Sequence, residues 1–297
     1  MASTHKVSGP TLACEITPER VIAARKTDDG AALDSYTARA IAAGVVVPRL
    51  GEANVGNSDA LKQAITDVLT TVGARTRDIV AIVPDASVRI ALLDFDTLPE
   101  KKADADGVVR FRLKKALPFD VDESVVSYDV FRSAGKIQVV AAVVLTSVLN
   151  EYEQVFRELG YAPGVVVPSA LAALGNVDEG DPVMVIKSDA TTTTVAIVGN
   201  GQLLLFRTLE NPSAGPPKAE QLAEDVHSSM VFFEDTYNMK VSRILVGGSL
   251  EAETIGSTLE SQTGVRVQDL VASRHLGAAH PNFPASALAG VVGALLG

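Results

Sequence analysis

The sequence predicts an α/β fold made of two copies of one three-strand unit, with a smaller α+β unit inserted in the first copy. Val183–Leu209 holds three β-rich runs separated by polar turns at 187–190 and 199–201. Residues 12–38 repeat this order of strand, turn, strand, turn and strand near the start of the chain. Residues 79–145 differ, because they read as two strands, one helix and two more strands. A duplicated architecture with an insertion follows from these three observations.

Bulk properties limit the function classes. The formal charge of −10 argues against a general nucleic-acid binder, which relies on Lys and Arg to neutralise phosphates. The single cysteine, Cys14, fits a reducing compartment, and its strand-like surroundings predict a buried, inert thiol. The most hydrophobic runs, Val139–Leu149 and Ala285–Leu296, are shorter than the roughly 20 residues of a membrane span. We therefore expect no direct membrane span.

The first half of the chain alternates helical and strand patterns. Ser58-Asp59 is the expected cap of a helix over 60–72, in which Leu61, Ile65 and Leu69 share one face. Pro118 is expected to stop a second helix over 101–117. The other elements expected here are strands at 78–83, 88–95, 125–131, 137–145 and 164–167, a turn at 133–135, and helices at 147–159 and 168–174.

The second half follows a polar linker at 176–182. The strongest helical pattern covers 218–239, with a predicted buried stripe of Leu222, Val226, Met230, Phe233 and Tyr237. A strand over 243–246 leads into Gly247-Gly248-Ser249 and a helix over 251–263. The last segment, 285–296, is apolar all round, which predicts a helix packed inside the protein.

Several polar features have two interpretations each. Gly247-Gly248 at a strand end indicates either a ligand-binding turn or an ordinary tight turn between strand and helix. Ser188–Thr194 suits either a phosphate or a half-exposed strand, and Lys187 either a phosphate ligand or an exposed cation. The basic residues of 110–115 form either a solvated helix face or a surface for an acidic partner.

The sequence contains little that supports a metal site or a catalytic nucleophile. His275 and His280 have no Cys or carboxylate neighbour at metal-ligand spacing. The chain also contains neither a Gly-x-Ser-x-Gly elbow nor a Walker loop. The sequence therefore predicts no metal site and no catalytic triad.

Taken together, the order of these segments resembles the actin-like ATPase superfamily. Within it the chain is most similar to the PilM family of type IV pilus assembly proteins, which is related to FtsA. The segments that carry the resemblance are Phe111–Asp129, Val139–Pro168, Val183–Thr208, Glu224–Gly248 and Ala287–Leu296.

This resemblance implies an actin-like (ribonuclease H-like) pair of duplicated subdomains with an inserted α+β subdomain of the SHS2-like kind. The first actin-like subdomain is expected at 1–78 and again at 146–176. The inserted subdomain is expected at 79–145, and the second actin-like subdomain at 177–297.

Two departures from the family affect its nucleotide cleft. The first hairpin turn reads Glu15-Ile16-Thr17-Pro18 and lacks the family's glycine, and Lys187-Ser188-Asp189 stands where the family has Asp-Ile-Gly. A lysine there repels the Mg²⁺ that phosphoryl transfer needs, and Asp189 adds negative charge where phosphate would lie. The implied cofactor is ATP with Mg²⁺, bound weakly at most. The residues of this degenerate site are Glu15, Thr17, Lys187, Ser188, Asp189, Thr191, Thr192, Gly247, Gly248 and Ser249.

The implied function is a cytoplasmic, non-catalytic scaffold at the inner membrane. Its partner would be the cytoplasmic N-terminal tail of a PilN-like bitopic protein, in a groove between the inserted subdomain and the first actin-like subdomain. The partner-binding candidates are Arg110, Phe111, Lys114, Pro118 and Phe119. A homo-oligomer is left open.

Two alternatives remain. One is an active actin-like ATPase or small-molecule kinase, in which Glu15 and Asp189 take over metal and water positioning. The other is the cytoplasmic domain of a GspL-like type II secretion protein.

Overall fold

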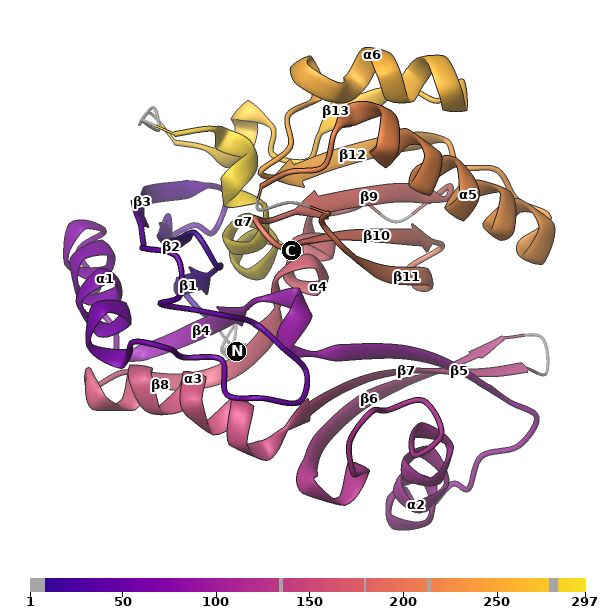
Figure 1. The fold of residues 1–297 in the computed structure, drawn as a ribbon, viewed down its shortest axis with the longest axis horizontal. Coiled ribbons are helices and arrows are strands. Elements are labelled where there is room, and N and C mark those ends of the chain that lie inside the picture. The colour runs from indigo at the N-terminus through magenta and orange to yellow at the C-terminus, as the bar shows by residue number, and fades with distance from the viewer. Residues whose placement is uncertain (1–8, 134–135, 179, 213–214, 278–282) are drawn as a thin grey trace, which may run out of the picture.

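The computed structural model describes residues 9–133, 136–178, 180–212, 215–277 and 283–297. The described chain forms two lobes, each built on a five-stranded sheet, and a three-stranded sheet that projects from the first lobe (Figure 1). His280 and parts of the predicted turn at 133–135 and linker at 176–182 lie outside these ranges.

The first lobe has the sheet order β3-β2-β1-β4-β8. β1 pairs antiparallel with β2, β2 pairs antiparallel with β3, and β4 lies parallel between β1 and β8. Helices α1 (Ser58–Thr71) and α3 (Thr146–Glu158) bury their apolar stripes in one shared core. The strands are β1 (Leu12–Ile16), β2 (Arg20–Lys26), β3 (Leu33–Ala40), β4 (Asp78–Val83) and β8 (Ala162–Pro168).

The second lobe repeats this topology with the order β11-β10-β9-β12-β13. Again three antiparallel strands are followed by two parallel ones. Helices α5 (Ala219–Tyr237) and α6 (Ala252–Thr263) lie together on one face of this sheet (Figure 1). The identical strand orders confirm the predicted duplication. The strands are β9 (Val183–Ser188), β10 (Thr192–Gly199), β11 (Gln202–Glu210), β12 (Arg243–Gly248) and β13 (Val267–Asp269).

The inserted sheet has the order β5-β7-β6 and comprises β5 (Arg89–Phe95), β6 (Ser124–Ser133) and β7 (Lys136–Leu145). Helix α2 (Lys102–Leu113) packs on it through Ala105, Val109 and Leu113. The expectation that the strand at 78–83 begins the inserted unit is wrong. That strand is β4, which pairs with β1 and β8 inside the first lobe, so the insertion follows it.

Two short helices connect the lobes. α4 (Ser169–Ala173) packs against α7 (Ala289–Leu296), and one apolar cluster around them includes residues of both sheets. Most of α7 is buried, as its uniformly apolar sequence predicts, although 285–288 are 3-10 and not α-helical. The 3-10 segments are η1 (Asp85–Ser87), η2 (Val121–Glu123), η3 (Leu174–Asn176), η4 (Ser273–His275) and η5 (Ala285–Leu288).

Helix ends differ slightly from the sequence prediction. The side chain of Asn57, and not Ser58 or Asp59, caps α1 by accepting the amide of Ala60. α2 ends at Leu113, four residues before the predicted end, and Ala116 N donates to Leu113 O in the turn that follows. In α5 the predicted stripe is buried except for the partly exposed Tyr237. Among the described residues, no helix has both the length and the apolar character of a membrane span.

Candidate functional site

The two duplicated hairpins end in turns of the same shape. Thr17 N donates to Arg20 O at 2.9 Å, and Asp189 N donates to Thr192 O at 2.9 Å. Glu15 and Lys187, each two residues before its turn, therefore hold equivalent positions in the two copies. Both are almost fully buried, with 0% and 3% exposure. The internal repeat thus brings one anion and one cation to the junction of the lobes.

Lys187 and Glu15 form an ion pair across this junction. Lys187 Nζ lies 2.9 Å from Glu15 Oε1, and Ser169 Oγ at the start of α4 is hydrogen-bonded to both groups. The interpretation of Lys187 as an exposed cation is therefore wrong, because every residue of β9 is buried between the layers. The pair links the central strand of each lobe.

Asp85 extends this buried network. It follows β4, and its carboxylate accepts Ala170 N at 2.8 Å and Thr194 Oγ1 at 3.2 Å. Burial raises the pKa of Asp85 to about 6, although the charge of Lys187 acts in the opposite direction. Burial alone would lower the pKa of Lys187, but the negative charges of Glu15 and Asp85 hold it above its usual value.

Carboxylates also occupy the backbone donors of the second hairpin turn. Asp189 Oδ1 accepts Thr191 N at 2.7 Å and Thr192 N at 2.8 Å. Glu19, from the first lobe, accepts Ala190 N at 3.3 Å. Successive amides in such a turn are the donors that bind phosphate in anion-binding loops. Here they bond to side chains of the same chain.

The hydroxyl groups of the candidate-site residues in the two hairpins bond within their own hairpins, whereas the buried Ser249 Oγ has no hydrogen-bond partner among the described residues. Thr17 Oγ1 accepts Arg20 N at 3.1 Å, and the Oγ atoms of Ser188 and Thr193 lie 2.9 Å apart. Thr191 Oγ1 and Thr192 Oγ1 donate to the two carboxylate oxygens of Asp189. These residues support the turn and do not point to an external anion.

The Gly247-Gly248 step is explained by internal packing. A Cβ on Gly247 would lie 2.9 Å from Ala289 Cβ of α7, and one on Gly248 would lie 2.1 Å from Ser188 O. Gly248 also has φ of +75°, where glycine is favoured. Ser249 N donates to Ser188 O at 2.8 Å. This geometry favours the tight turn over the ligand-binding interpretation.

The residues present do not fit magnesium-bound triphosphate. The ammonium of Lys187 lies where the resemblance would place a metal-holding carboxylate, and the amides at 190–192 bond to Glu19 and Asp189. Among the residues that the structure describes, no group of three His, Cys, Asp or Glu side chains could hold a metal ion. Charged side chains of the chain itself therefore occupy the positions that metal-bound triphosphate would need.

A separate hollow lies between the inserted sheet and the first lobe, and we call it the junction groove. Its volume is about 230 Å³, and β4, β6, β7, α3 and β8 all contribute to it. β8, on one side, is the edge strand of its sheet. Tyr152 also lines the groove. Its OH bonds to Ser87 and Asn54, and burial raises the pKa of this phenol. The apolar lining of the junction groove includes Val83, Val88, Val144, Leu149, Val166 and Pro168.

The five predicted partner-binding residues do not line the junction groove. Arg110 donates to Val121 O at 2.9 Å, and Lys114 pairs with Asp122 at 2.9 Å. Phe111 is 69% exposed on α2. Pro118 is exposed, and Phe119 packs partly against the cores of both the insertion and the first lobe.

Sequence reasoning missed Glu19, Asp85 and Ser169. A usable signal exists for Asp85 and Ser169, since each follows a strand of the parallel part of the sheet, and polar groups at carboxyl ends of such strands converge. Glu19 carries no such signal, because its role depends on contact with the other lobe.

Comparison with solved structures shows which known fold the two lobes and the inserted sheet resemble. The chain superposes on a protein of the "PilM-PilN type IV pilus biogenesis complex" with a TM-score of 0.80 and 16% identity, covering 98% of both chains. The chain shares the fold of PilM.

Two further likenesses have lower scores. A Bacteroides thetaiotaomicron protein described as having an actin-like ATPase fold gives a TM-score of 0.54 at 10% identity, over 90% of this chain and 93% of that chain. The cytoplasmic domain of EpsL, an inner-membrane component of the Vibrio cholerae type II secretion system, gives 0.54 at 9% identity, over 95% and 93%. The predicted actin-like fold is therefore confirmed. No family model and no curated protein matches the chain.

Proposed function

We propose that this chain is a PilM-like, non-catalytic scaffold of an inner-membrane assembly platform for a type IV pilus or a related secretion machine. Its place would be the cytoplasmic side of the membrane, where it would be held through a partner. The partner would be the cytoplasmic N-terminal tail of a PilN-like bitopic protein.

The observation that carries the non-catalytic part is the buried ion pair of Glu15 and Lys187. Kinases and ATPases rely on a bound metal ion to offset the negative charge of the phosphates. A lysine that is already paired with a carboxylate cannot bind that metal. Asp189 and Glu19 add negative charge at the amides where phosphate would have to bind. These contacts support a structural role for the cleft.

The junction groove supports the binding role. An extended peptide can add to the free edge of β8 through backbone hydrogen bonds while its apolar side chains enter the groove. Val165 of β8 is 52% exposed, so the sheet beside this edge is open to solvent. The solved PilM-PilN complex unites a protein of the same fold with a partner of this class, which supports the choice of a PilN-like tail.

The test is calorimetry with a synthetic peptide of the N-terminal cytoplasmic tail of a PilN-like membrane protein from the same organism. We expect saturable binding to the full chain. Leu149→Asp should weaken binding at least about tenfold, because it places a charge in the apolar groove.

Val231→Asp is the matched control, since Val231 is 45% exposed on α5 of the other lobe. This variant should bind the peptide as the unmodified chain does. Absence of binding at high micromolar peptide, or equal weakening by both variants, would exclude the junction groove as the tail site. Release of phosphate from Mg-ATP by the unmodified chain would refute the non-catalytic role.

A further inference from the structure

Strand β6 is an edge strand of the inserted sheet. It pairs with β7 over ten consecutive residues without a register shift, and its other side has no partner strand in the described chain. The opposite edge strand, β5, faces β11 of the second lobe. Val125 and Val130 of β6 are 40% and 36% exposed, and the strand contains neither Pro nor Lys. Proteins usually protect such edges with bulges, Pro or charged side chains, especially Lys. β6 carries the charged residues Asp129 and Arg132 but no register shift, Pro or Lys, so it is suited to strand pairing.

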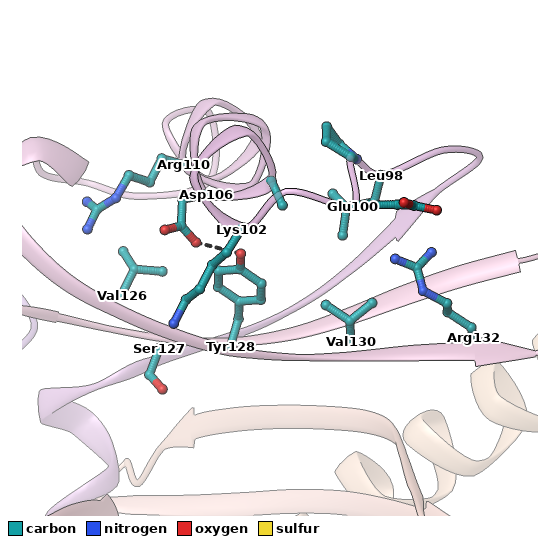
Figure 2. A pocket seen from close by; sticks show the side chains of 12 residues that line it. Leu98, Glu100, Lys102, Asp106, Arg110, Val126, Ser127, Tyr128, Val130 and Arg132 are labelled. Carbon is teal, nitrogen blue, oxygen red and sulfur yellow. Dashed lines mark hydrogen bonds between the residues drawn. The ribbon is translucent and has the colours of Figure 1, made fainter.

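The side of the edge that faces α2 is also open. A groove of about 420 Å³ separates α2 from β6. Figure 2 shows Val126, Tyr128 and Val130 pointing from β6 toward α2, while Ser127 points to the other face. Tyr128 OH donates to Asp106 at 2.5 Å, which fixes the tyrosine at the middle of the strand. An added strand would therefore meet little steric hindrance on this side.

The order of side chains in β6 is nearly the same in both directions from Tyr128. In an antiparallel pair of two β6 strands centred on this residue, directly opposite residues share a face of the sheet. Apolar residues then meet apolar residues, and polar residues meet polar residues. The opposed pairs are Val126 with Val130, Val125 with Phe131, Ser127 with Asp129, and Tyr128 with its own copy.

The charges at the two ends of β6 are complementary in the same register. Asp122, which is also paired with Lys114, and Glu123 precede the strand, and Arg132 and Lys136 lie at its far end and the start of β7. All four residues are exposed. Antiparallel pairing about Tyr128 places the acidic end of one copy beside the basic end of the other, which favours this register.

We propose that two copies of this chain pair along β6, antiparallel and with Tyr128 on the two-fold axis. The pairing joins the two three-stranded sheets into one continuous sheet across the dimer. A two-fold interface uses the same patch on both subunits, and the near-palindromic strand supplies such a patch. This inference does not depend on the proposed pilus function, because it uses the backbone edge of β6, whereas the tail is assigned to the edge of β8, although Val125 and Ser127 of β6 also line the junction groove.

Sedimentation of the full chain tests the pairing. We expect a species of twice the monomer mass, and we expect Val130→Lys to raise its dissociation constant at least about tenfold, since it puts two lysines at the pairing edge. Val165→Lys is the control, because Val165 is an exposed valine on the edge strand of another sheet. This control should sediment as the unmodified chain does.

Cysteine cross-linking tests the register. The native cysteine, Cys14, is buried and does not compete. A tagged Val126→Cys chain mixed with an untagged Val130→Cys chain should form a disulfide on oxidation. Val130→Cys alone should not, because its two copies would lie about 13 Å apart along the strand, beyond the roughly 7 Å limit between Cα atoms.

Three results would overturn the proposal. One is a chain that sediments as a monomer at all concentrations, even if its β6 can pair with an added peptide. Another is a dimer that Val130→Lys and Val165→Lys leave equally stable. The third is a disulfide that Val130→Cys forms with itself as readily as with Val126→Cys.

Discussion

Lys187 is the only lysine or arginine among the buried residues of the described chain, and it lies among carboxylates. Its partners come from the first lobe, from α4 and from the segment after β4. A buried ion pair contributes little net stability compared with an apolar replacement, but the loss of one member leaves a charge without a partner. Lys187 should therefore affect stability strongly only when it is changed alone.

Lys187→Met is expected to lower the free energy of unfolding by about 3–5 kcal/mol, because it leaves Glu15 buried and unpaired. Urea denaturation followed by circular dichroism measures this loss. Combining Lys187→Met with Glu15→Gln should restore at least half of the lost stability, since Glu15 no longer carries an unpaired charge and only Asp85 still lacks the charge of Lys187. A single variant as stable as the unmodified chain would show that the pair is not buried in solution.

Asp85 should give stability a distinct pH dependence. Its pKa rises from 3.8 to about 6 on folding because burial disfavours the charged carboxylate. Between these values the folded state holds more protons than the unfolded state, so the free energy of unfolding falls as the pH rises through this window. Asp85→Asn removes this contribution. The difference in stability, unmodified chain minus variant, should therefore decrease from pH 3.8 to about 6.

Urea titrations of both proteins across this range measure that difference. Burial lowers the pKa of His275, so any contribution of this residue to stability has the opposite slope. Its effect is present in both proteins and cancels in the comparison. A difference that is constant or increases with pH would contradict the raised pKa of Asp85.

At this scale the sequence could predict only part of the site. Glu15, Lys187 and Asp189 were identified because a family resemblance marked their positions. The contacts of these three residues could not be predicted. The sequence of β9 does not show that both of its faces are buried, so an exposed Lys187 was equally compatible with it. Asp85 and Ser169 join the network only through contacts between residues distant in the chain.

Helices α4 and α7 approach each other closely. A Cβ on Gly293 of α7 would lie 2.1 Å from Ala172 O of α4, and one on Gly290 would lie 2.4 Å from Glu15 Oε2. Both glycines therefore permit the contact between the helices and the buried carboxylate. The small, apolar sequence of α7 predicts a buried helix, but not which helix it packs against.

Gly293→Ala is expected to lower the free energy of unfolding by about 1–3 kcal/mol, because backbone atoms of α4 would have to move. Gly256→Ala in α6 is the matched control, since its Cβ would meet Val267 at an ordinary 3.7 Å. That variant should gain about 0.4–1 kcal/mol from reduced freedom of the unfolded chain. Thermal and urea unfolding compare the two, and equal effects would contradict the close packing of α4 and α7.

The strand at 78–83 shows why element order predicts more than element partners. Its sequence defines a buried strand correctly, with bounds that the structure reproduces. Its neighbours in the chain suggested that it belonged to the insertion. It pairs instead with β1 and with β8, which lies after the whole insertion, and such long-range pairing has no local signal.

For the whole molecule, the duplication was the most predictable property. Two identical strand orders produce two hairpin turns of the same shape, and the repeated pattern of strands and turns already indicated them. How the lobes meet was not predictable in the same way. In this chain the contact between them includes an ion pair, a carboxylate bonded to an amide of the other lobe, and an apolar cluster around α4 and α7.

This arrangement of the lobes should therefore be independent of nucleotide. A ligand present at 100 times its dissociation constant adds about 2.7 kcal/mol of stability, which raises the melting temperature of a protein of this size by roughly 4 °C. We expect millimolar Mg-ATP to shift the melting temperature of the unmodified chain by less than about 1 °C. The double variant Lys187→Asp, Asp189→Gly removes the cation and frees the amides of Thr191 and Thr192, so Mg-ATP should raise its melting temperature relative to the same variant without nucleotide. A clear shift in the unmodified chain would mean that the internal carboxylates and Lys187 do not exclude the nucleotide.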